Sequence, residues 1–339
     1  MGRLNASDIN PAVREAGNGE GMILWGSGTM SASKRLTVVP QGLIHVPVTP
    51  FRSDNKIDLD TFGRVIEFLL GHDAASLCIN LHLAESLNLT MEERKQLAKA
   101  AVESVAGRVP LIVHVSMPGT DQAVDLARHA AEIGADCVMA IAPYYWKPSQ
   151  EGLYAHFAAI MSATDLPFIA YSSPTIMDGI GIAPATLVQL MERFPQFIGL
   201  KEASHNWEKY LELGRAAKKI RADFGLFVGT EWMIPCLTLG GTACMSIFGG
   251  IAPRFVRALY QATTSGRLTE ALALQYKFSE LYQIAKVEYP APTKAMWEIM
   301  GRPVGAPRLP NRPLAAERKK EIRSALETLG LFDTEPHGW

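Results

Sequence analysis

Eight short apolar runs recur along the chain, each bounded by glycine, proline or polar residues, and they constrain the fold more than any other feature. Longer segments separate them and carry apolar residues at helical spacing, as in 58–72, 91–107 and 120–134. Short buried strands that alternate with amphipathic helices are typical of βα units around a parallel sheet. The predicted strands cover residues 42–48, 75–80, 110–116, 137–142, 167–172, 197–201, 225–229 and 243–247.

Eight βα units in about 225 residues predict an α/β fold of the (β/α)8 TIM barrel type, whose usual length is about 250 residues. A doubly wound sheet is the alternative, but no GxGxxG follows the first strand and no P-loop occurs. Residues at the helix ends agree with the units. Asp58, Thr90 and Thr120 stand at predicted N-caps, and Gly107 and Gly134 stand at predicted C-caps.

Three regions follow from this pattern. Residues 1–38 are rich in glycine, serine, asparagine and aspartate, so we expect a poorly structured N-terminal extension. Residues 39–268 form the predicted barrel, and residues 269–339 form a C-terminal helical region. Its predicted helices cover 269–287, 292–300 and 315–329.

Composition argues against several classes of partner. With a formal net charge of -1 and no long basic run, the chain lacks the electrostatic footprint of a nucleic-acid binder. No apolar run reaches the roughly 18 residues that span a membrane, so we expect no membrane association. The four cysteines lie far apart in apolar surroundings without a CxxC pattern. They indicate reduced core residues, and we therefore expect a cytoplasmic protein.

Lys201 closes a strand that is otherwise apolar, and Tyr171 lies near the end of the preceding strand. Active sites of (β/α)8 barrels lie at the carboxyl ends of the strands, so both side chains are expected at the barrel mouth. An amine withdrawn from water favours its neutral form, which attacks a carbonyl to give a Schiff base, and a tyrosine hydroxyl beside it can move protons. The structural alternative is an ion pair of Lys201 with Glu202 or Glu85. Position alone leaves both interpretations open.

Several longer motifs appear in order along the chain. They are "VTPF" (48–51), "APYYWKPSQEGLYAHF" (142–157), "YSSP" (171–174), "GLKEAS" (199–204) and "LGGTACMSI" (239–247). From about Gly42 to Leu314 the chain thereby resembles the class I aldolases of the dihydrodipicolinate synthase and N-acetylneuraminate lyase family. The resemblance implies a (β/α)8 barrel with a C-terminal helical region, assembled as a homotetramer or homodimer. It implies no cofactor and a small-molecule carbonyl substrate.

The resemblance also implies roles for particular residues. Lys201 matches the imine-forming lysine, and Tyr171 matches the general acid and base. Tyr145 belongs to a tyrosine pair, one member of which reaches across the subunit contact into the neighbouring site. The expected substrate-binding positions are Leu83, Ala84, Glu85, Ile176, Glu231, Met245 and Ser246.

The segment "LHLAES" (81–86) departs from the G-[ST]-[ST]-G-E pattern usual in the family, whose hydroxyls and backbone amides hold the carboxylate of pyruvate. Leu83 replaces the carboxylate-binding hydroxyl, and His82 replaces the hydroxyl that relays protons to the tyrosine. Because imidazole titrates near neutral pH, His82 is a candidate catalytic residue. The alternative is a rim histidine hydrogen-bonded to Glu85. His114 on the next strand can also face inward, but we find no third ligand at metal-binding spacing and expect no metal.

A second departure follows "YSSP". Family members that condense aspartate semialdehyde with pyruvate carry an arginine two residues after the proline, where this chain has Ile176. With Leu83, this predicts an enzyme other than a dihydrodipicolinate synthase. We expect a Schiff-base-dependent carbon-carbon lyase that acts on a 2-oxo acid or related carbonyl compound with a bulky, largely apolar group. Glu231 lies where sugar-cleaving members place a hydroxyl binder, so a dehydratase or aldolase of a 2-keto-3-deoxy sugar acid stays open, as does a non-catalytic ligand-binding barrel.

Overall fold

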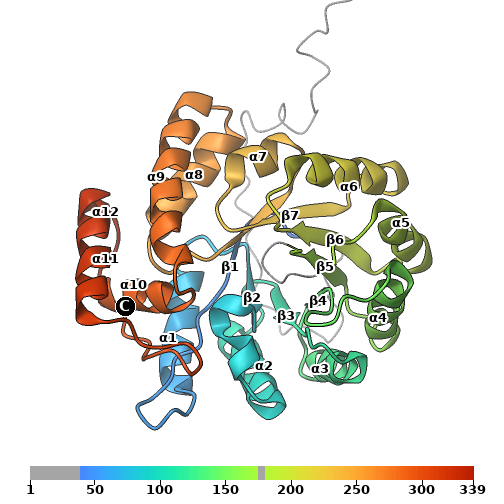
Figure 1. The fold of residues 1–339 in the computed structure, drawn as a ribbon, viewed down its shortest axis with the longest axis horizontal. Coiled ribbons are helices and arrows are strands. Elements are labelled where there is room, and N and C mark those ends of the chain that lie inside the picture. Colours follow the sequence, from blue (N-terminus) through green and yellow to red (C-terminus); the bar gives the residue numbers. More distant parts are fainter. Residues whose placement is uncertain (1–38, 175–179) are drawn as a thin grey trace, which may run out of the picture.

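The chain forms a closed barrel of eight parallel strands, β1 to β8, in sequence order (Figure 1). The computed structural model describes residues 39–174 and 180–339, so the predicted extension 1–38 and Ile176 lie outside the described residues. The last strand pairs with the first and closes the barrel. The strands are β1 (Gly42–His45), β2 (Ser76–Ile79), β3 (Leu111–His114), β4 (Cys137–Ile141), β5 (Phe168–Ser172), β6 (Phe197–Glu202), β7 (Gly225–Gly229) and β8 (Ala243–Ser246). The predicted (β/α)8 barrel is confirmed.

A helix follows each strand, and together these helices surround the barrel in Figure 1. Two short 3-10 turns, η3 (His82–Ala84) and η4 (Ser86–Asn88), lie between β2 and its helix. The helices are α1 (Leu59–Leu70), α2 (Met91–Val105), α3 (Thr120–Glu132), α4 (Gln150–Ser162), α5 (Pro184–Arg193), α6 (Trp207–Ile220), α7 (Met233–Thr238) and α8 (Pro253–Thr264).

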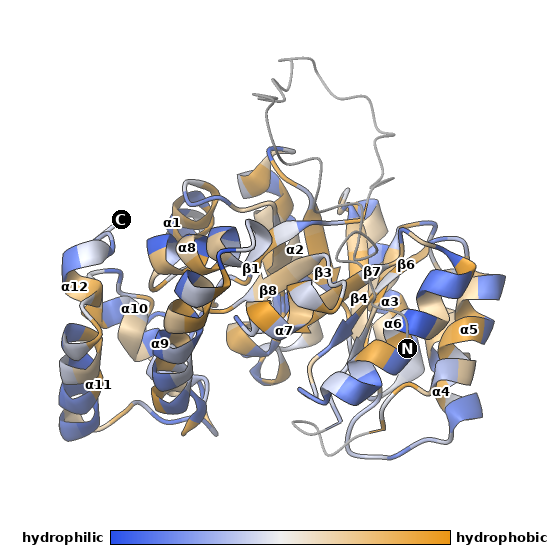
Figure 2. Cartoon of the chain, turned by 90° about the horizontal axis from the view of Figure 1, so that it is seen from above, coloured by the Kyte–Doolittle hydropathy of each residue, from blue (hydrophilic) through white to orange (hydrophobic). Residues whose placement is uncertain are grey.

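Further helices lie beside the barrel and follow α8 in the chain. Figures 1 and 2 show α10, α11 and α12 grouped on one side of the molecule, with α9 between them and the barrel. Figure 2 shows that α11 is largely hydrophilic, and its buried residues are Ile322 and Leu326. The predicted C-terminal helices are confirmed, whereas their separation from the barrel as a domain stays a prediction. Their bounds are α9 (Leu268–Lys286), α10 (Ala291–Ile299), α11 (Ala316–Thr328) and α12 (Leu331–Thr334).

Side-chain caps begin two of the barrel helices as predicted. The Asp58 carboxylate accepts a hydrogen bond from the backbone amide of Thr61, and Thr90 forms a capping box with Glu93. The prediction for Thr120 was wrong by one position, because Gly119 is the N-cap and Thr120 is the first helical residue. Such a shift is within the ordinary uncertainty of helix ends.

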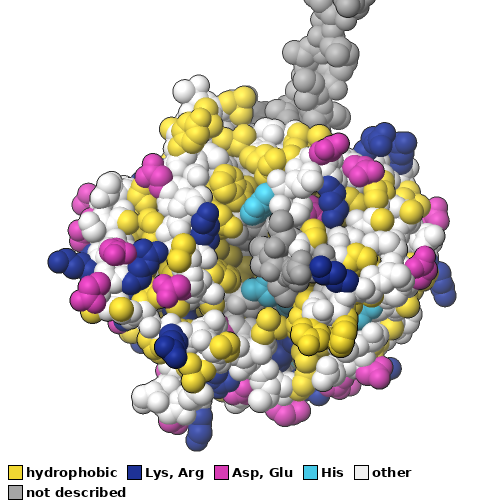
Figure 3. Space-filling model, in the orientation of Figure 1, with side chains coloured by type: hydrophobic (Ala, Val, Ile, Leu, Met, Phe, Trp, Pro, Cys, Tyr) yellow, Lys and Arg dark blue, Asp and Glu magenta, His cyan; other side chains and the backbone are white. Residues whose placement is uncertain are grey.

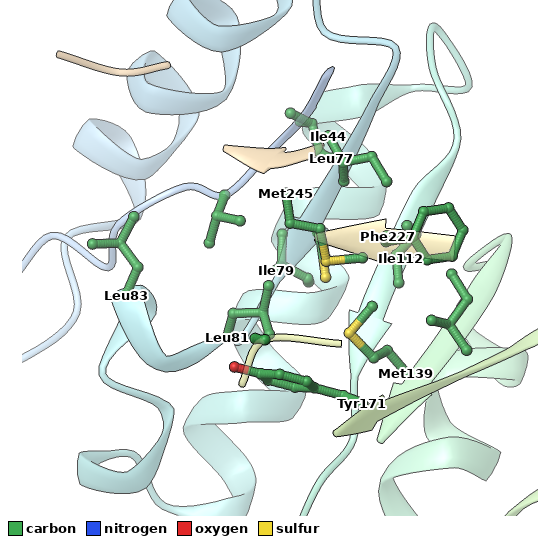
Figure 4. Packing of buried hydrophobic residues seen from close by; sticks show 14 of the residues in the cluster. Ile44, Leu77, Ile79, Leu81, Leu83, Ile112, Met139, Tyr171, Phe227 and Met245 are labelled. Carbon is green, nitrogen blue, oxygen red and sulfur yellow. The ribbon is translucent and has the colours of Figure 1, made fainter. Parts of the chain in front are cut away.

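The barrel interior is filled with apolar side chains from alternating strand positions (Figure 4). The ring of Phe227 on β7 lies over two glycines, one on β7 and one on the neighbouring strand β6. Any larger residue at either position would collide with the ring. A Cβ atom added at Gly199 or at Gly225 would lie 2.5 Å from the Phe227 ring. These two glycines therefore leave room for one aromatic ring in the barrel interior. Among the described helices, none is both long and apolar enough to cross a membrane.

Candidate active site

Lys201 and Tyr171 lie side by side at the carboxyl ends of β6 and β5. They occupy paired positions on these neighbouring strands, and Lys201 Nζ lies 3.8 Å from the centre of the Tyr171 ring. Both are nearly buried, with exposed fractions of 6% and 3%. The electron-rich ring face is a favourable neighbour for the amine. The nitrogen and the aromatic side chain therefore form one site.

Neither carboxylate that was considered as an ion-pair partner of Lys201 occupies that position. Glu202 accepts a hydrogen bond from the backbone amide of Ser204 at 2.8 Å and lies 3.9 Å from Lys209 Nζ. Glu85 pairs with Lys294 instead. Within residues 39–174 and 180–339, no ion pair holds Lys201, so its nitrogen is available for chemistry.

Gly229 leaves room for the Lys201 side chain to extend across the mouth. It lies at the end of β7, next to β6. A Cβ atom at this position would lie 3.0 Å from Lys201 Cε and 3.0 Å from the Cβ atom of Ala203. Contacts this short require the lysine or its surroundings to move. The absence of a side chain at Gly229 therefore helps to set the direction of the lysine.

A cavity of about 450 Å³ opens above these residues. Figure 3 shows hydrophobic and histidine side chains around the hollow near the centre of this face. Lys201, Tyr171 and His82 line the cavity, together with apolar residues such as Leu81, Leu83 and Ile247. A concave, mostly apolar cavity with a few convergent polar groups is the usual form of a small-molecule site.

Glu85 lines the cavity, but its carboxylate is bound on the protein side. Oε1 lies 2.9 Å from Lys294 Nζ, and Oε2 accepts a hydrogen bond from the backbone amide of Arg308 at 2.9 Å. Burial lowers the pKa of Lys294 to about 8, whereas the charge of Glu85 acts in the opposite direction. Both carboxylate oxygens of Glu85 therefore already have partners within the protein. That Glu85 also binds substrate stays a prediction.

His114 is held in one tautomer by its hydrogen bonds. Its Nδ1 lies 2.9 Å from the carbonyl oxygen of Asn80, which only accepts, so Nδ1 carries the proton. Nε2 therefore accepts the hydrogen bond from Ser116 Oγ at 2.7 Å. Ser116 Oγ in turn accepts from the backbone amide of Ile141 at 2.6 Å. Burial keeps the pKa of His114 well below its ordinary value, so this ring is a neutral, fixed part of the wall.

His82 lines the cavity and lies next to both His114 and Tyr171, whose own ring centres are 6.3 Å apart. The centre of its ring lies 5.8 Å from that of His114 and 5.6 Å from that of Tyr171. Burial, followed by the charge of Lys201, lowers the pKa of His82 to about 3. The Glu85 amide donates to the His82 carbonyl at 2.9 Å, but among the described contacts no hydrogen bond joins the His82 ring to Glu85. A neutral imidazole at this position can accept a proton on one nitrogen and release one from the other.

Leu83 and Ala84 differ in their access to the cavity. Leu83 lines it and offers no hydrogen bond, as expected from the sequence. Ala84 is buried and is not among the described residues that line the cavity. Its amide donates a hydrogen bond to the carbonyl of Leu81 at 3.0 Å, and its carbonyl accepts one from the Thr49 hydroxyl at 2.7 Å. The Ala84 backbone is therefore occupied, so the predicted binding role of this residue lacks a free group.

Glu231, Met245 and Ser246 are not among the described cavity-lining residues, although each was predicted to contact substrate. Ser246 Oγ donates to Glu231 Oε1 at 2.6 Å, and the amide of Phe248 donates to the same oxygen at 2.9 Å. Burial raises the pKa of Glu231 to about 7. Met245 packs in the barrel interior (Figure 4). The Met245 carbonyl accepts a hydrogen bond from the amide of Thr230 at 3.1 Å, and Thr230 does line the cavity.

Tyr145 lies on the surface rather than in the cavity of its own chain. Its side chain is 84% exposed, its φ angle is 77°, and its ring lies 5.1 Å from the ring of Trp146, which is 75% exposed. A positive φ at a tyrosine is uncommon. Two adjoining exposed aromatic rings are typical of protein interfaces.

Several cavity residues were missed because they come from the loop after β6 and from the C-terminal region. No local motif marks them. The usable signal is helical spacing at the end of α9, since Tyr282, Ala285 and Lys286 share one helix face. The missed lining residues include His205, Tyr282, Lys286, Tyr289 and Asn311.

The described residues contain no group of three or more His, Cys, Asp or Glu side chains arranged to hold a metal ion. The two histidines near Tyr171 differ in what their nitrogens do. Both nitrogens of His114 are engaged by Asn80 and Ser116. This pair therefore does not provide two free imidazole ligands directed at one point.

The closed barrel and the lysine at its mouth define an enzyme of the class I aldolase type, a lyase. The sequence pattern of the Dihydrodipicolinate synthetase family matches residues 39–329, and the chain belongs to this family. The 4-hydroxy-tetrahydrodipicolinate synthase of Gluconacetobacter diazotrophicus is 34% identical over 88% of this chain and 99% of its own length.

Two solved structures show the same similarity. YagE from E. coli K12, a prophage protein of the dihydrodipicolinic acid synthase family in complex with pyruvate, is 26% identical, with a TM-score of 0.81. The match covers 86% of this chain and 99% of that one. A monomeric dihydrodipicolinate synthase variant is 28% identical, with a TM-score of 0.81 and coverage of 86% and 97%.

These relatives correct the function predicted from the sequence. The exclusion of dihydrodipicolinate synthase chemistry was wrong, because curated relatives named 4-hydroxy-tetrahydrodipicolinate synthase are 32–34% identical over most of the chain. The exclusion rested on Leu83 and Ile176, of which only Leu83 lies in the described residues. Loss of one side-chain donor does not exclude a carboxylate, since backbone amides and other side chains can bind it. The apolar-substrate lyase and its alternatives are therefore not retained.

Proposed function

We propose that Lys201 forms a Schiff base with pyruvate and that the enzyme condenses it with aspartate semialdehyde, as a 4-hydroxy-tetrahydrodipicolinate synthase. The observation that carries the proposal is the contact of Lys201 Nζ with the Tyr171 ring inside the cavity. The names of the full-length relatives and the pyruvate complex of YagE support it.

The steps follow from the chemistry of the two side chains. The neutral Lys201 amine attacks the C2 carbonyl of pyruvate, and the carbonyl oxygen leaves as water after it gains protons. The Tyr171 hydroxyl supplies and recovers protons in these transfers. Loss of a proton from C3 then gives an enamine, whose carbon attacks the aldehyde carbon of the second substrate. The amino group of the condensed aspartate semialdehyde unit then attacks the imine carbon and displaces the Lys201 amine, which closes the ring of the product and releases the enzyme.

His82 carries protons between Tyr171 and the substrate in this proposal. Its ring lines the cavity next to Tyr171 and is neutral, because its pKa is lowered to about 3. A neutral imidazole relays a proton by accepting on one nitrogen while it donates from the other. His114 does not serve this purpose, because Asn80 and Ser116 engage both of its nitrogens.

The experiment is reduction with sodium borohydride in the presence of pyruvate, followed by intact-mass spectrometry and peptide mapping. We expect one adduct per chain on Lys201 and none in Lys201→Ala. Tyr171→Phe should still form the adduct, but more slowly. A matched assay with pyruvate and aspartate semialdehyde should show condensation in the wild type alone. Folded wild-type protein that forms no adduct would rule out the proposal.

We also propose that the enzyme is a cytoplasmic homotetramer or homodimer in which Tyr145 reaches the site of a neighbouring subunit. The exposed rings of Tyr145 and Trp146 support an interface, and the four free, buried cysteines agree with a reducing compartment. Light scattering tests the assembly, and Tyr145→Ser should lower both the assembled mass and turnover. A monomeric wild type with full activity would contradict the proposal.

A further inference from the structure

Lys286 is a lysine at the mouth of the cavity. It is the last residue of α9 and lines the cavity with Tyr282 and Ala285. Residues three and four positions apart share a helix face, so this face of α9 is directed at the cavity. Lys286 is exposed. Across the part of the chain that the structure describes, no ion pair engages its ammonium group.

The charges around the cavity are not balanced. The described lining includes Glu85, Lys201 and Lys286 as its charged residues. Glu85 has a buried partner, Lys294, at 2.9 Å. The described cavity wall therefore has one amine beside Tyr171, a second cation at the mouth and no carboxylate that lacks a partner. Such an arrangement attracts an anionic group to the mouth.

His205 extends this side of the mouth. Its ring centre lies 6.4 Å from that of Tyr282, and both residues line the cavity with Lys286. Burial lowers the pKa of His205 below its ordinary value, so it contributes a neutral imidazole that can donate a hydrogen bond. An amine and an imidazole on one wall are complementary to a carboxylate.

We propose that Lys286 binds the carboxylate of the second substrate, which lies away from the reacting carbons once this substrate has condensed with the imine at Lys201, and thereby selects anionic aldehydes over neutral ones. A 2-oxo acid with a distal carboxylate serves as a stand-in for this condensed imine. The inference rests on the proposed imine chemistry of Lys201.

The test compares two probes of equal chain length, 2-oxoadipate and 2-oxohexanoate, which differ in the distal carboxylate. The concentration that gives half-maximal borohydride trapping on Lys201 is measured for each. We expect wild type to prefer 2-oxoadipate by about three- to tenfold, because the contact is charged but partly solvated. Lys286→Met should bring this ratio close to one, Lys286→Arg should keep most of it, and high salt should weaken it.

Lys219→Met is the matched control. Lys219 is also an exposed lysine in the last turn of its helix, α6, and it is not among the described cavity-lining residues. This variant should keep the wild-type ratio. If Lys286→Met keeps the wild-type preference for 2-oxoadipate over 2-oxohexanoate, the inference is wrong. The proposed function would still hold in that case, provided that pyruvate is trapped on Lys201. Absence of any pyruvate adduct in wild type would instead defeat the proposed function and, with it, the inference.

Discussion

Lys294 Nζ lies 2.9 Å from Glu85 Oε1, and the two side chains are almost completely withdrawn from solvent. Lys294 belongs to α10, whereas Glu85 lies between the two 3-10 turns that follow β2. The backbone amide of Arg308 binds the other carboxylate oxygen. The C-terminal region therefore holds Glu85 in place, and with it the neighbouring turn whose residues His82 and Leu83 line the cavity.

Lys294→Met should destabilise the enzyme strongly. The substitution leaves the Glu85 carboxylate buried without its cation, a change that typically costs about 3–5 kcal/mol. Urea denaturation followed by circular dichroism measures the free energy of unfolding. The double variant Glu85→Gln, Lys294→Met removes both charges and should recover part of the loss. Equal stability of Lys294→Met and wild type would show that this pair does not hold the turn.

Ser116→Ala should lower stability through the hydrogen bonds of its hydroxyl. The hydroxyl donates to His114 Nε2 at 2.7 Å and accepts from the amide of Ile141 at 2.6 Å. Leaving these buried groups without partners costs about 1–3 kcal/mol. Ser76→Ala is the control, because Ser76 Oγ is buried and has no hydrogen-bond partner among the described residues. Equal urea midpoints for the two variants would contradict the proposed locking of His114.

The stability contribution of Glu231 should fall as pH rises between about 4.5 and 7. Burial raises its pKa from the ordinary value of 4.5 to about 7, so in this window the folded state binds more protons than the unfolded state. Stability then decreases with rising pH, by at most about 3 kcal/mol, and levels off above pH 7. The penalty is absent when the carboxyl is protonated in both states.

Glu231→Gln isolates this effect, since the amide does not titrate and the histidines titrate alike in both proteins. The free energy of unfolding is measured for wild type and Glu231→Gln at pH 5 and pH 8. We expect wild type to lose stability relative to the variant at the higher pH. A difference that stays constant between the two pH values would show that the Glu231 carboxyl has an ordinary pKa in the folded enzyme.

The fold could be predicted from the sequence because the spacing of apolar residues depends directly on which side of each strand or helix is buried. The predicted strands 197–201 and 225–229 differ from β6 and β7 by at most one residue. Lys201 and Tyr171 were recognisable because a polar residue at the end of an apolar strand has few positions in a barrel except the mouth. Local pattern was enough for these features.

Contacts between distant segments were not recognisable in this way. The partner of Glu85 lies more than 200 residues away on α10, and nothing near Glu85 marks Lys294 as that partner. Glu231 stood at a position that suggested substrate contact, yet Ser246 and the amide of Phe248 bind its carboxylate inside the protein. Lys286 was missed for the same reason, since a lysine at a helix end looks like an ordinary solvated residue.

Gly229→Ala should slow imine formation without unfolding the enzyme. The new methyl group would lie 3.0 Å from Lys201 Cε and 3.0 Å from the Cβ atom of Ala203, so the lysine must shift by a few tenths of an ångström. Misplacement of a reacting group of this order costs about tenfold in rate, given that about 1 Å can cost a hundredfold. The rate of adduct formation with pyruvate, measured by timed borohydride quenching, reports the change.

Gly63→Ala is the matched control for this last substitution. Gly63 lies within α1, and a Cβ atom there would meet nothing within 4 Å. Alanine in a helix interior is more favourable than glycine by about 1 kcal/mol, so this variant should melt at a higher temperature and form the imine at the wild-type rate. If Gly229→Ala instead reacts as fast as wild type while it remains folded, the space at Gly229 does not set the position of Lys201. The direction of the lysine would then come from its contact with the Tyr171 ring alone.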